Sequence, residues 1–230
     1  MKIPQIIKRN RNSIILIDLQ KQSDGNQIQI NIRGTGFIIS PDGTFVTNAH
    51  VYKSIPENEL QHIGASVPGE NKNNVVRYDR FPVELIKIDE ENDVAIMKII
   101  SKRSFEPAAS FDNSETVEEG DETVFIGYPL ANEMLAMGFG ITMTANQCLI
   151  SSIKRRGIDG SLHFYLIDTH TNNGSSGSPI FSLRTGKIIG IVSGKISSRV
   201  PATNGQVMDI PANIGLCRPI KYAIDLINKK

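Results

Sequence analysis

The stretch GTGFIISPDGTFVTNAHV, residues 34–51, decides the fold of this chain. Two short apolar runs, 36–39 and 44–47, lie on either side of the turn-forming sequence Pro-Asp-Gly. Runs of this length joined by such a turn are typical of paired antiparallel strands. The second run leads into a turn of small residues that carries His50, so a strand end presents a histidine.

Short apolar or alternating runs of the same kind continue along most of the chain. They are rich in Ile and Val, and Gly, Asn, Asp or Pro often stands between them, as expected for strands joined by turns. Helical patterns do not intervene, which argues against βαβ units and predicts an all-β protein, an antiparallel sandwich or barrel. The predicted strands cover residues 14–19, 28–32, 36–39, 44–47, 81–88, 94–100, 123–126, 141–153, 164–167, 179–181 and 187–193.

A few segments depart from the strand pattern. After Arg218, the sequence PIKYAIDLINKK spaces apolar residues at helical intervals and predicts a helix over about 219–228. Residues 69–74 and 196–212 predict loops. An acidic stretch at 114–122 separates two sets of strands, so we expect one domain over residues 1–230, with a first barrel at about 12–115 and a second at about 122–218.

Composition limits the classes of function. The chain has 230 residues, of which 40% are hydrophobic, so it can bury a sizeable core. Its formal net charge of +1 does not favour binding to nucleic acid or to a membrane surface. The first residues contain no apolar stretch of leader length. Cys148 and Cys217 are the two cysteines of the chain, and we interpret them as buried thiols in a reducing compartment. Together with the lack of a leader-like stretch, they predict a cytoplasmic location.

Three local patterns occur in the order His, Asp, Ser. FVTNAHV at 45–51 carries His50, NDVAIMKI at 92–99 places Asp93 directly before a strand, and NNGSSGSPIF at 172–181 sets Ser176 between glycines. A serine nucleophile needs an imidazole to accept its proton, and the imidazole needs a carboxylate to fix its tautomer. We therefore predict a serine peptidase with these three residues as its catalytic triad. An α/β-hydrolase is excluded, because its histidine follows the serine and none follows Ser176.

The glycines around Ser176 indicate a tight turn whose amide groups bind a developing negative charge. We predict the N–H groups of Gly174 and Ser176 as this oxyanion hole. Taken singly, the three triad residues also fit ordinary roles in a core or a turn, and their occurrence together favours catalysis. His62 and His163 have no cysteine or carboxylate at metal-ligand spacing, so we predict neither a metal nor a cofactor.

The chain resembles the trypsin-like peptidases of the HtrA/Deg type. Residues 34–51 are similar to the strand pair and histidine turn of that family, and NDVAIMKI to its aspartate strand. The segments 141–155, 167–181, 186–193 and 214–227 are similar to its second barrel and terminal helix. The resemblance implies a chymotrypsin-like double six-stranded antiparallel β-barrel with a C-terminal α-helix. The chain departs from the family at Ser178 and Ser175, where a glycine and an asparagine are usual.

The resemblance also implies how a substrate binds. By alignment, His170 and Thr171 line the specificity pocket, while Ser193, Gly194 and Lys195 form its other wall and pair with substrate as a β-strand. These side chains favour an acidic or polar residue before the scissile bond. The implied partner is a protein or peptide, and neither nucleic acid nor a membrane is expected.

The sequence leaves two questions open: whether the chain is an active enzyme, and what controls its activity. The alternative to an endopeptidase is a catalytically silent or latent module of the same fold that binds extended peptides. A constantly active cytoplasmic protease would also be harmful to its cell. We therefore expect a specific target protein or a regulatory partner, such as a component of a bacterial defence system. The oligomeric state is not predicted.

Overall fold

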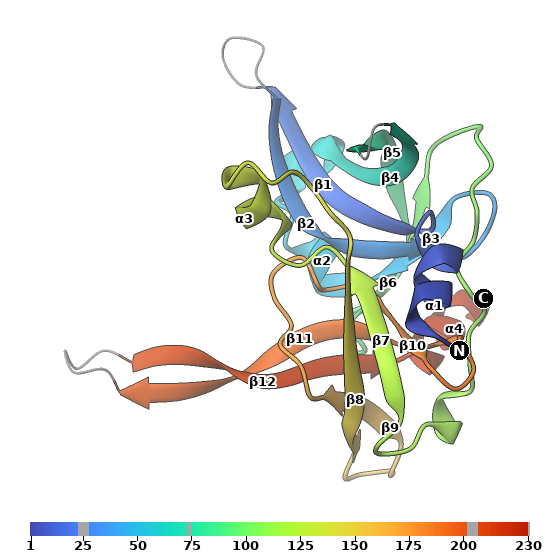
Figure 1. Cartoon of the computed structure of the whole chain (residues 1–230), viewed down its shortest axis with the longest axis vertical. Helices are drawn as coiled ribbons and strands as arrows, with labels where there is room; N and C mark the ends of the chain where they lie inside the picture. Colours follow the sequence, from blue (N-terminus) through green and yellow to red (C-terminus); the bar gives the residue numbers. More distant parts are fainter. Residues whose placement is uncertain (23–27, 73–74, 202–206, 230) are drawn as a thin grey trace.

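The computed structural model describes residues 1–22, 28–72, 75–201 and 207–229. It contains two closed six-stranded antiparallel barrels followed by a helix, which confirms the predicted chymotrypsin-like fold. In Figure 1 the first barrel, in blue and cyan, lies above the second, in yellow-green to red. Two of the three predicted motifs, those with His50 and Asp93, belong to the first barrel, and the one with Ser176 belongs to the second.

The first barrel has the strand order β1-β2-β3-β6-β5-β4. Its interior is filled by aliphatic and aromatic side chains from alternate strand positions, among them Ile15, Ile17, Phe45 and Met97. The short helix α2 (Ala49–Lys53) and the 3-10 helix η1 (Glu57–His62) connect β3 to β4. The strands are β1 (Ile14–Gln22), β2 (Ile28–Ile38), β3 (Thr44–Thr47), β4 (Ile63–Lys72), β5 (Val75–Asp89) and β6 (Val94–Ile99).

The second barrel has the strand order β10-β11-β12-β9-β8-β7. Phe125, Tyr165 and Ile180 fill its core, where Cys148 and Cys217 are both buried as free thiols. The C-terminal helix α4 (Lys221–Asn228) follows directly. The strands are β7 (Glu122–Gly127), β8 (Thr144–Arg155), β9 (Leu162–Ile167), β10 (Pro179–Ser182), β11 (Ile188–Pro201) and β12 (Val207–Pro219).

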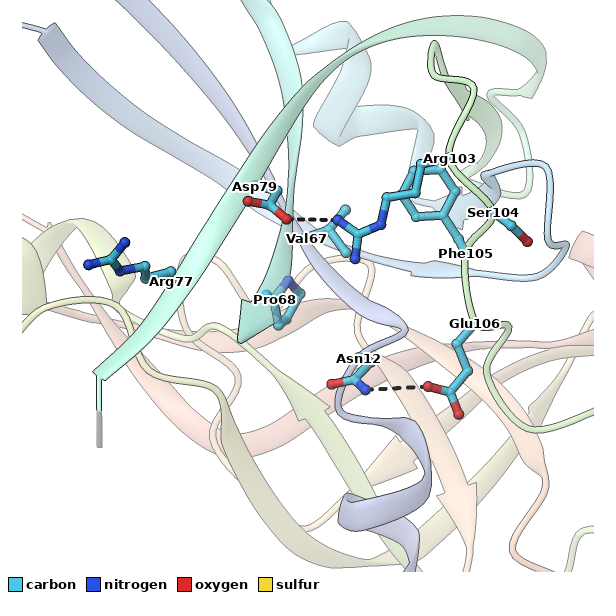
Figure 2. Close-up of a pocket in the computed structure, with 10 residues that line it drawn as sticks. Asn12, Val67, Pro68, Arg77, Asp79, Arg103, Ser104, Phe105 and Glu106 are labelled. Carbon is cyan, nitrogen blue, oxygen red and sulfur yellow. Dashed lines mark hydrogen bonds and ion pairs between the residues drawn. The ribbon is translucent and has the colours of Figure 1, made fainter. Parts of the chain in front are cut away.

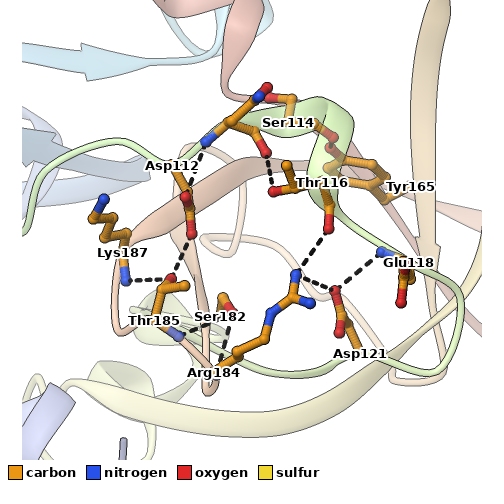
Figure 3. Close-up of polar contacts among 11 residues, drawn as sticks. Asp112, Ser114, Thr116, Glu118, Asp121, Tyr165, Ser182, Arg184, Thr185 and Lys187 are labelled. Atoms are coloured by element: carbon orange, nitrogen blue, oxygen red, sulfur yellow. Dashed lines mark hydrogen bonds and ion pairs between the residues drawn. The ribbon is translucent and has the colours of Figure 1, made fainter.

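The segment between the barrels, 100–121, is fastened to the second barrel by polar contacts (Figure 3). The Tyr165 hydroxyl donates to the Ser114 carbonyl at 2.7 Å, within the 3-10 helix η2 (Ser114–Thr116). The Arg184 guanidinium donates to the Thr116 carbonyl at 2.8 Å and lies 3.4 Å from the Asp121 carboxylate. These contacts hold the segment between the barrels against the second barrel.

The prediction of a loop over residues 196–212 is wrong. Strand β11 extends to Pro201 and β12 begins at Val207, and together they form a hairpin that projects from the second barrel in Figure 1. Residues 202–206 lie outside the described ranges. Pro, Asn and Gly in this segment favoured turns, but the alternation of apolar and polar residues on either side is a strand pattern. The predicted loop 69–74 is also wrong where it is described, because β4 continues to Lys72.

Several boundaries differ from prediction as well. The runs 28–32 and 36–39 are parts of the single strand β2, β8 begins at Thr144, and β4 was not predicted. Helix α4 begins at Lys221, since Pro219 still belongs to β12. The short helices α1 (Ile3–Asn10), α2 and α3 (Ala131–Ala136) also escaped prediction. Helices as short as α2 and α3 carry little periodic signal, and short helices depend on packing for their stability.

Helix α1 illustrates this dependence on packing. Ile6 is fully buried, and the Asn10 side chain accepts a hydrogen bond from the Ala109 amide at 2.7 Å in the segment between the barrels. Neither contact is visible from the local sequence. None of the helices in the described ranges has the length and apolar character required to cross a bilayer.

Candidate active site

His50, Asp93 and Ser176 meet at the junction of the two barrels. His50 lies in α2 at the end of β3, Asp93 lies in the turn between β5 and β6, and Ser176 precedes β10. The His50 Nε2 atom is 2.9 Å from Ser176 Oγ. The His50 Nδ1 atom is 2.9 Å from Asp93 Oδ2 and 3.0 Å from Oδ1. The imidazole thus bridges a carboxylate of the first barrel and a hydroxyl of the second.

The surroundings of Asp93 favour its ionised form. Burial raises the pKa of Asp93, but hydrogen bonds and the nearby charge of His50, with a hydrogen bond from the Ser193 hydroxyl, bring it below its usual range. An ionised carboxylate only accepts hydrogen bonds, so Nδ1 of His50 has to carry the proton between them. In neutral His50, Nε2 is then an acceptor for the Ser176 hydroxyl.

The turn that carries Asp93 is held by the second barrel. Asp93 has a φ of +55°, a left-handed conformation that aspartate tolerates better than most residues. Arg156 donates to the Asn92 side-chain oxygen at 2.8 Å, and Arg218 donates to the Glu91 carbonyl at 3.2 Å. The sequence did not assign Arg156 or Arg218 to the site. Each arginine contacts a residue that is far away in the sequence, so no local signal pointed to these contacts.

We expect Asp93 to stabilise the fold only while it is ionised. Its pKa in the folded protein lies below the unfolded value of about 3.9. The stabilisation is therefore complete above that value and is lost as the pH falls through the folded pKa. In urea titrations, the excess free energy of unfolding of the wild type over Asp93→Asn should shrink in acid. An excess that stays constant from neutral pH into strong acid would contradict this expectation.

The turn around Ser176 requires glycine at two positions. Gly174 has a φ of +88° and Gly177 a φ of +87°. A Cβ atom at Gly174 would lie 2.2 Å from the Tyr128 carbonyl oxygen, and one at Gly177 would lie 1.9 Å from the Thr35 carbonyl oxygen. Both obstacles are backbone atoms that cannot rotate away. The turn is therefore packed tightly against both barrels.

Two amide groups of this turn, those of Gly174 and Ser176, differ from the others, which donate to backbone carbonyls. The Asn173 carbonyl accepts a hydrogen bond from the Leu130 amide at 2.7 Å. Because the peptide bond is planar and trans, the Gly174 N–H is directed away from Leu130. Within the described part of the chain, neither the Gly174 nor the Ser176 amide donates to a backbone acceptor. Leu130 has a φ of +54°, and Asp93 has a similar positive φ. Strained backbone therefore occurs in the first barrel at Asp93 and in the second at Leu130.

A cavity of about 200 Å³ opens beside Ser176. Four of the five predicted substrate-binding residues line it, namely Thr171, Ser193, Gly194 and Lys195. His170 is exposed and does not belong to the lining. Sequence reasoning missed Asn172, Asn173, Ser175 and Val192 as lining residues, although all four lie within the segments that it quoted.

A larger cavity, of about 700 Å³, lies against the first barrel (Figure 2). Two hydrogen bonds within the cavity wall involve its charged side chains. The Arg103 guanidinium donates to Asp79 at 2.7 Å, and the Asn12 amide donates to Glu106 at 3.3 Å. None of the residues predicted for catalysis or substrate binding lines this cavity, so size alone does not identify the candidate site.

Comparison with known proteins identifies the family. Residues 34–191 match the family model of the trypsin-like peptidase domain, which is more than half of the chain. The chain belongs to the trypsin-like peptidase family. Probable periplasmic serine endoproteases described as DegP-like, from Chlamydia pneumoniae and Pseudomonas savastanoi pv. phaseolicola, are each 32% identical to this peptidase domain, over 75% and 85% of the chain. The predicted resemblance to the HtrA/Deg type is thereby confirmed.

The match covers only part of these relatives. The two DegP-like proteins are matched over 31% and 34% of their own length. The magnetosome formation protease MamE of Paramagnetospirillum magneticum is 33% identical over 69% of this chain and is matched over 19% of its length. The trypsin-like peptidase domain described here thus spans about a third or less of the curated relatives that it matches.

The predicted cytoplasmic location is wrong. The relatives from Chlamydia pneumoniae, Pseudomonas savastanoi and Rickettsia prowazekii are all named as probable periplasmic endoproteases. The prediction depended on the small number of cysteines and on the first residues of the chain. Two buried thiols do not report on the compartment, because a well-filled barrel core needs no disulfide to be stable. The argument that a cytoplasmic protease needs a regulatory partner loses its premise as well.

Proposed function

We propose that this trypsin-like peptidase domain is a serine endopeptidase that works through an acyl-enzyme on Ser176. The observation that carries the proposal is the continuous hydrogen-bonded chain from Asp93 through His50 to Ser176, with 2.9 Å on each side of the imidazole. Geometry of this kind activates a hydroxyl that is otherwise a weak nucleophile. The substrate is a protein or peptide, as the family implies, and for its place of action we propose the periplasm, from the names of the relatives.

The proposed reaction has two halves. Ser176 Oγ attacks the scissile carbonyl carbon while its proton passes to Nε2 of His50, and Asp93 stabilises the imidazolium that results. His50 then gives the proton to the leaving amine as the carbon–nitrogen bond breaks, which leaves the acyl group on Ser176. A water molecule then transfers a proton to His50 and attacks the acyl carbon. The bond from that carbon to Ser176 Oγ breaks, Oγ takes the proton back from His50, and the new carboxyl terminus leaves.

The turn around Ser176 supplies the other part of the proposal. The amides of Gly174 and Ser176 are the donors that we assign to the oxyanion of each tetrahedral intermediate. Their direction is set before any substrate arrives, through the Asn173 carbonyl and the positive φ of Gly174. Donors held in place in this way stabilise the transition state without a cost of reorganisation.

A fluorophosphonate probe tests this proposal, because it reacts only with an activated serine. We expect the purified wild-type protein to gain the mass of one adduct, located on Ser176 by peptide mapping, and Ser176→Ala to gain none. The control Ser151→Ala removes an exposed serine hydroxyl on β8 and should label like the wild type.

Absence of an adduct on the wild type would contradict the proposal. It would instead support the alternative of a silent or latent module that binds extended peptides.

A further inference from the structure

The hairpin of β11 and β12 carries an apolar face that the described residues do not cover. We call residues 196–201 and 207–210 the arm. Directly opposite residues in its two strands are Ser198 with Ile210 and Val200 with Met208, and such pairs lie on the same face. Ile196 shares that face by the two-residue period of a strand. The exposed fractions are 37% for Ile196, 41% for Val200, 54% for Met208 and 45% for Ile210.

The opposite face of the arm is polar at its centre, while at its tip Pro201 pairs with Val207, which is 64% exposed. At the centre, Arg199 lies across from Asp209, and their charged groups are 3.6 Å apart. A two-stranded ribbon is only marginally stable by itself and normally needs a further strand or a packed face. The face with Ile196, Val200, Met208 and Ile210 carries the larger set of exposed aliphatic side chains, so it is the one that we expect a partner to cover.

One edge of the arm continues directly from the substrate cavity. Val192 still pairs with the nucleophile turn, since its amide donates to the Ser178 carbonyl at 2.9 Å and its carbonyl accepts from the Gly177 amide at 2.8 Å. Beyond Val192, no described strand pairs with this edge of β11, while β12 occupies the other edge as far as Pro201. Lys195 lines the substrate cavity, and the arm begins at the next residue.

We propose that the arm extends the substrate-binding edge, so that a long substrate pairs with β11 from Ser193 to Pro201 and places aliphatic side chains on Ile196 and Val200. The inference rests on the proposed function of the neighbouring site. An extended peptide added to an open edge gains main-chain hydrogen bonds, and the side chains beside it determine its specificity. The stretch 196–201 adds about 20 Å of strand, enough to pair with several residues ahead of those held at the cavity.

The proposal selects a class of substrate. The preferred protein has an extended segment with aliphatic residues roughly four to eight positions before the scissile bond. Such segments are buried in folded proteins and become accessible in unfolded chains or exposed tails. A peptide that ends about three residues before the scissile bond reaches the cavity but not the arm.

The main test measures peptide binding to the Ser176→Ala protein, so that it does not depend on turnover. A fluorescent peptide with aliphatic residues along the segment that faces the arm is compared with a short peptide that lacks that segment. We expect Val200→Ser to raise the Kd of the long peptide about tenfold and to leave that of the short peptide unchanged. The matched control Arg199→Ser alters the neighbouring residue on the polar face and should change neither Kd by more than about twofold.

A second measurement asks whether the peptide pairs as a strand. A single N-methyl group is placed in turn at each residue of the segment that faces the arm. Because backbone N–H groups alternate in direction along a strand, methylation should weaken binding at every second residue only. A uniform response along the segment would overturn the pairing.

Three results would overturn the inference. The first is that the long peptide binds no more tightly than the short one, and the second is that Val200→Ser leaves the Kd of the long peptide unchanged. The third is a dimer in size analysis that Val200→Ser dissociates while peptide binding stays the same. That result would assign the apolar face to a second copy of the chain. Cleavage of the short peptide by the wild type tests the proposed function separately, so failure of one does not imply failure of the other.

Discussion

Replacing Ser176 or His50 by alanine is expected to lower kcat/KM for a cleaved peptide by about four to six orders of magnitude. Without Ser176 there is no atom to form the acyl-enzyme. Without His50 the hydroxyl loses the imidazole, 2.9 Å away, that we propose as the acceptor of its proton. The measurement is the initial rate of hydrolysis of a fluorogenic peptide at neutral pH, with folding checked by thermal unfolding.

The double variant provides the sharper control. Because the two residues act on one proton transfer, removing both should cost about as much as removing either one alone. Multiplicative losses would mean that His50 and Ser176 contribute through separate steps. Activity of His50→Ala within about tenfold of the wild type would exclude this imidazole as the general base.

Gly174→Ala is expected to lower kcat by about 100- to 1,000-fold with a smaller change in KM. The new Cβ would lie 2.2 Å from the Tyr128 carbonyl oxygen, so the backbone of the turn has to move. That movement redirects the Gly174 N–H, which we propose as a donor to the oxyanion. The donor acts mainly in the transition state, and for this reason the loss should fall on kcat.

Gly120→Ala is the matched control for this prediction. Gly120 also has a positive φ, +94°, but a Cβ atom there would meet nothing within 4 Å. Both substitutions force alanine into the left-handed region at a cost of about 1–2 kcal/mol in folding free energy. Only Gly174→Ala adds the collision beside Ser176. Equal kinetic effects of the two variants would show that backbone strain alone explains the loss.

The strands and the three motifs were predictable because their signals are local. The alternation of apolar residues, the turn sequences such as Pro-Asp-Gly, and the glycines around Ser176 are set by neighbours within a few residues. The order His50, Asp93, Ser176 then limited the choice of fold, and the resemblance to a peptidase family supplied the two barrels. Local turn signals also explain why residues 196–212 were mistaken for a loop.

Other features of the site depend on residues brought together only by folding. Arg218 supports the turn of Asp93 from the second barrel, and Ser193, predicted as a pocket wall, also donates to the Asp93 carboxylate. His170 was placed in the pocket by its position in a motif, yet it is exposed outside the lining.

The sequence by itself determined the all-β class, most of the strands, the three motifs that carry His50, Asp93 and Ser176, and the family that the chain resembles. Only the tertiary structure decided which arginines hold the aspartate turn, which residues line the cavity and how far the open edge of β11 extends beyond it. The physical reason is one of range. Strand periodicity and turn conformation depend on interactions between residues that are close in the sequence. Packing and hydrogen bonds between the barrels join residues more than a hundred positions apart, such as Glu91 and Arg218.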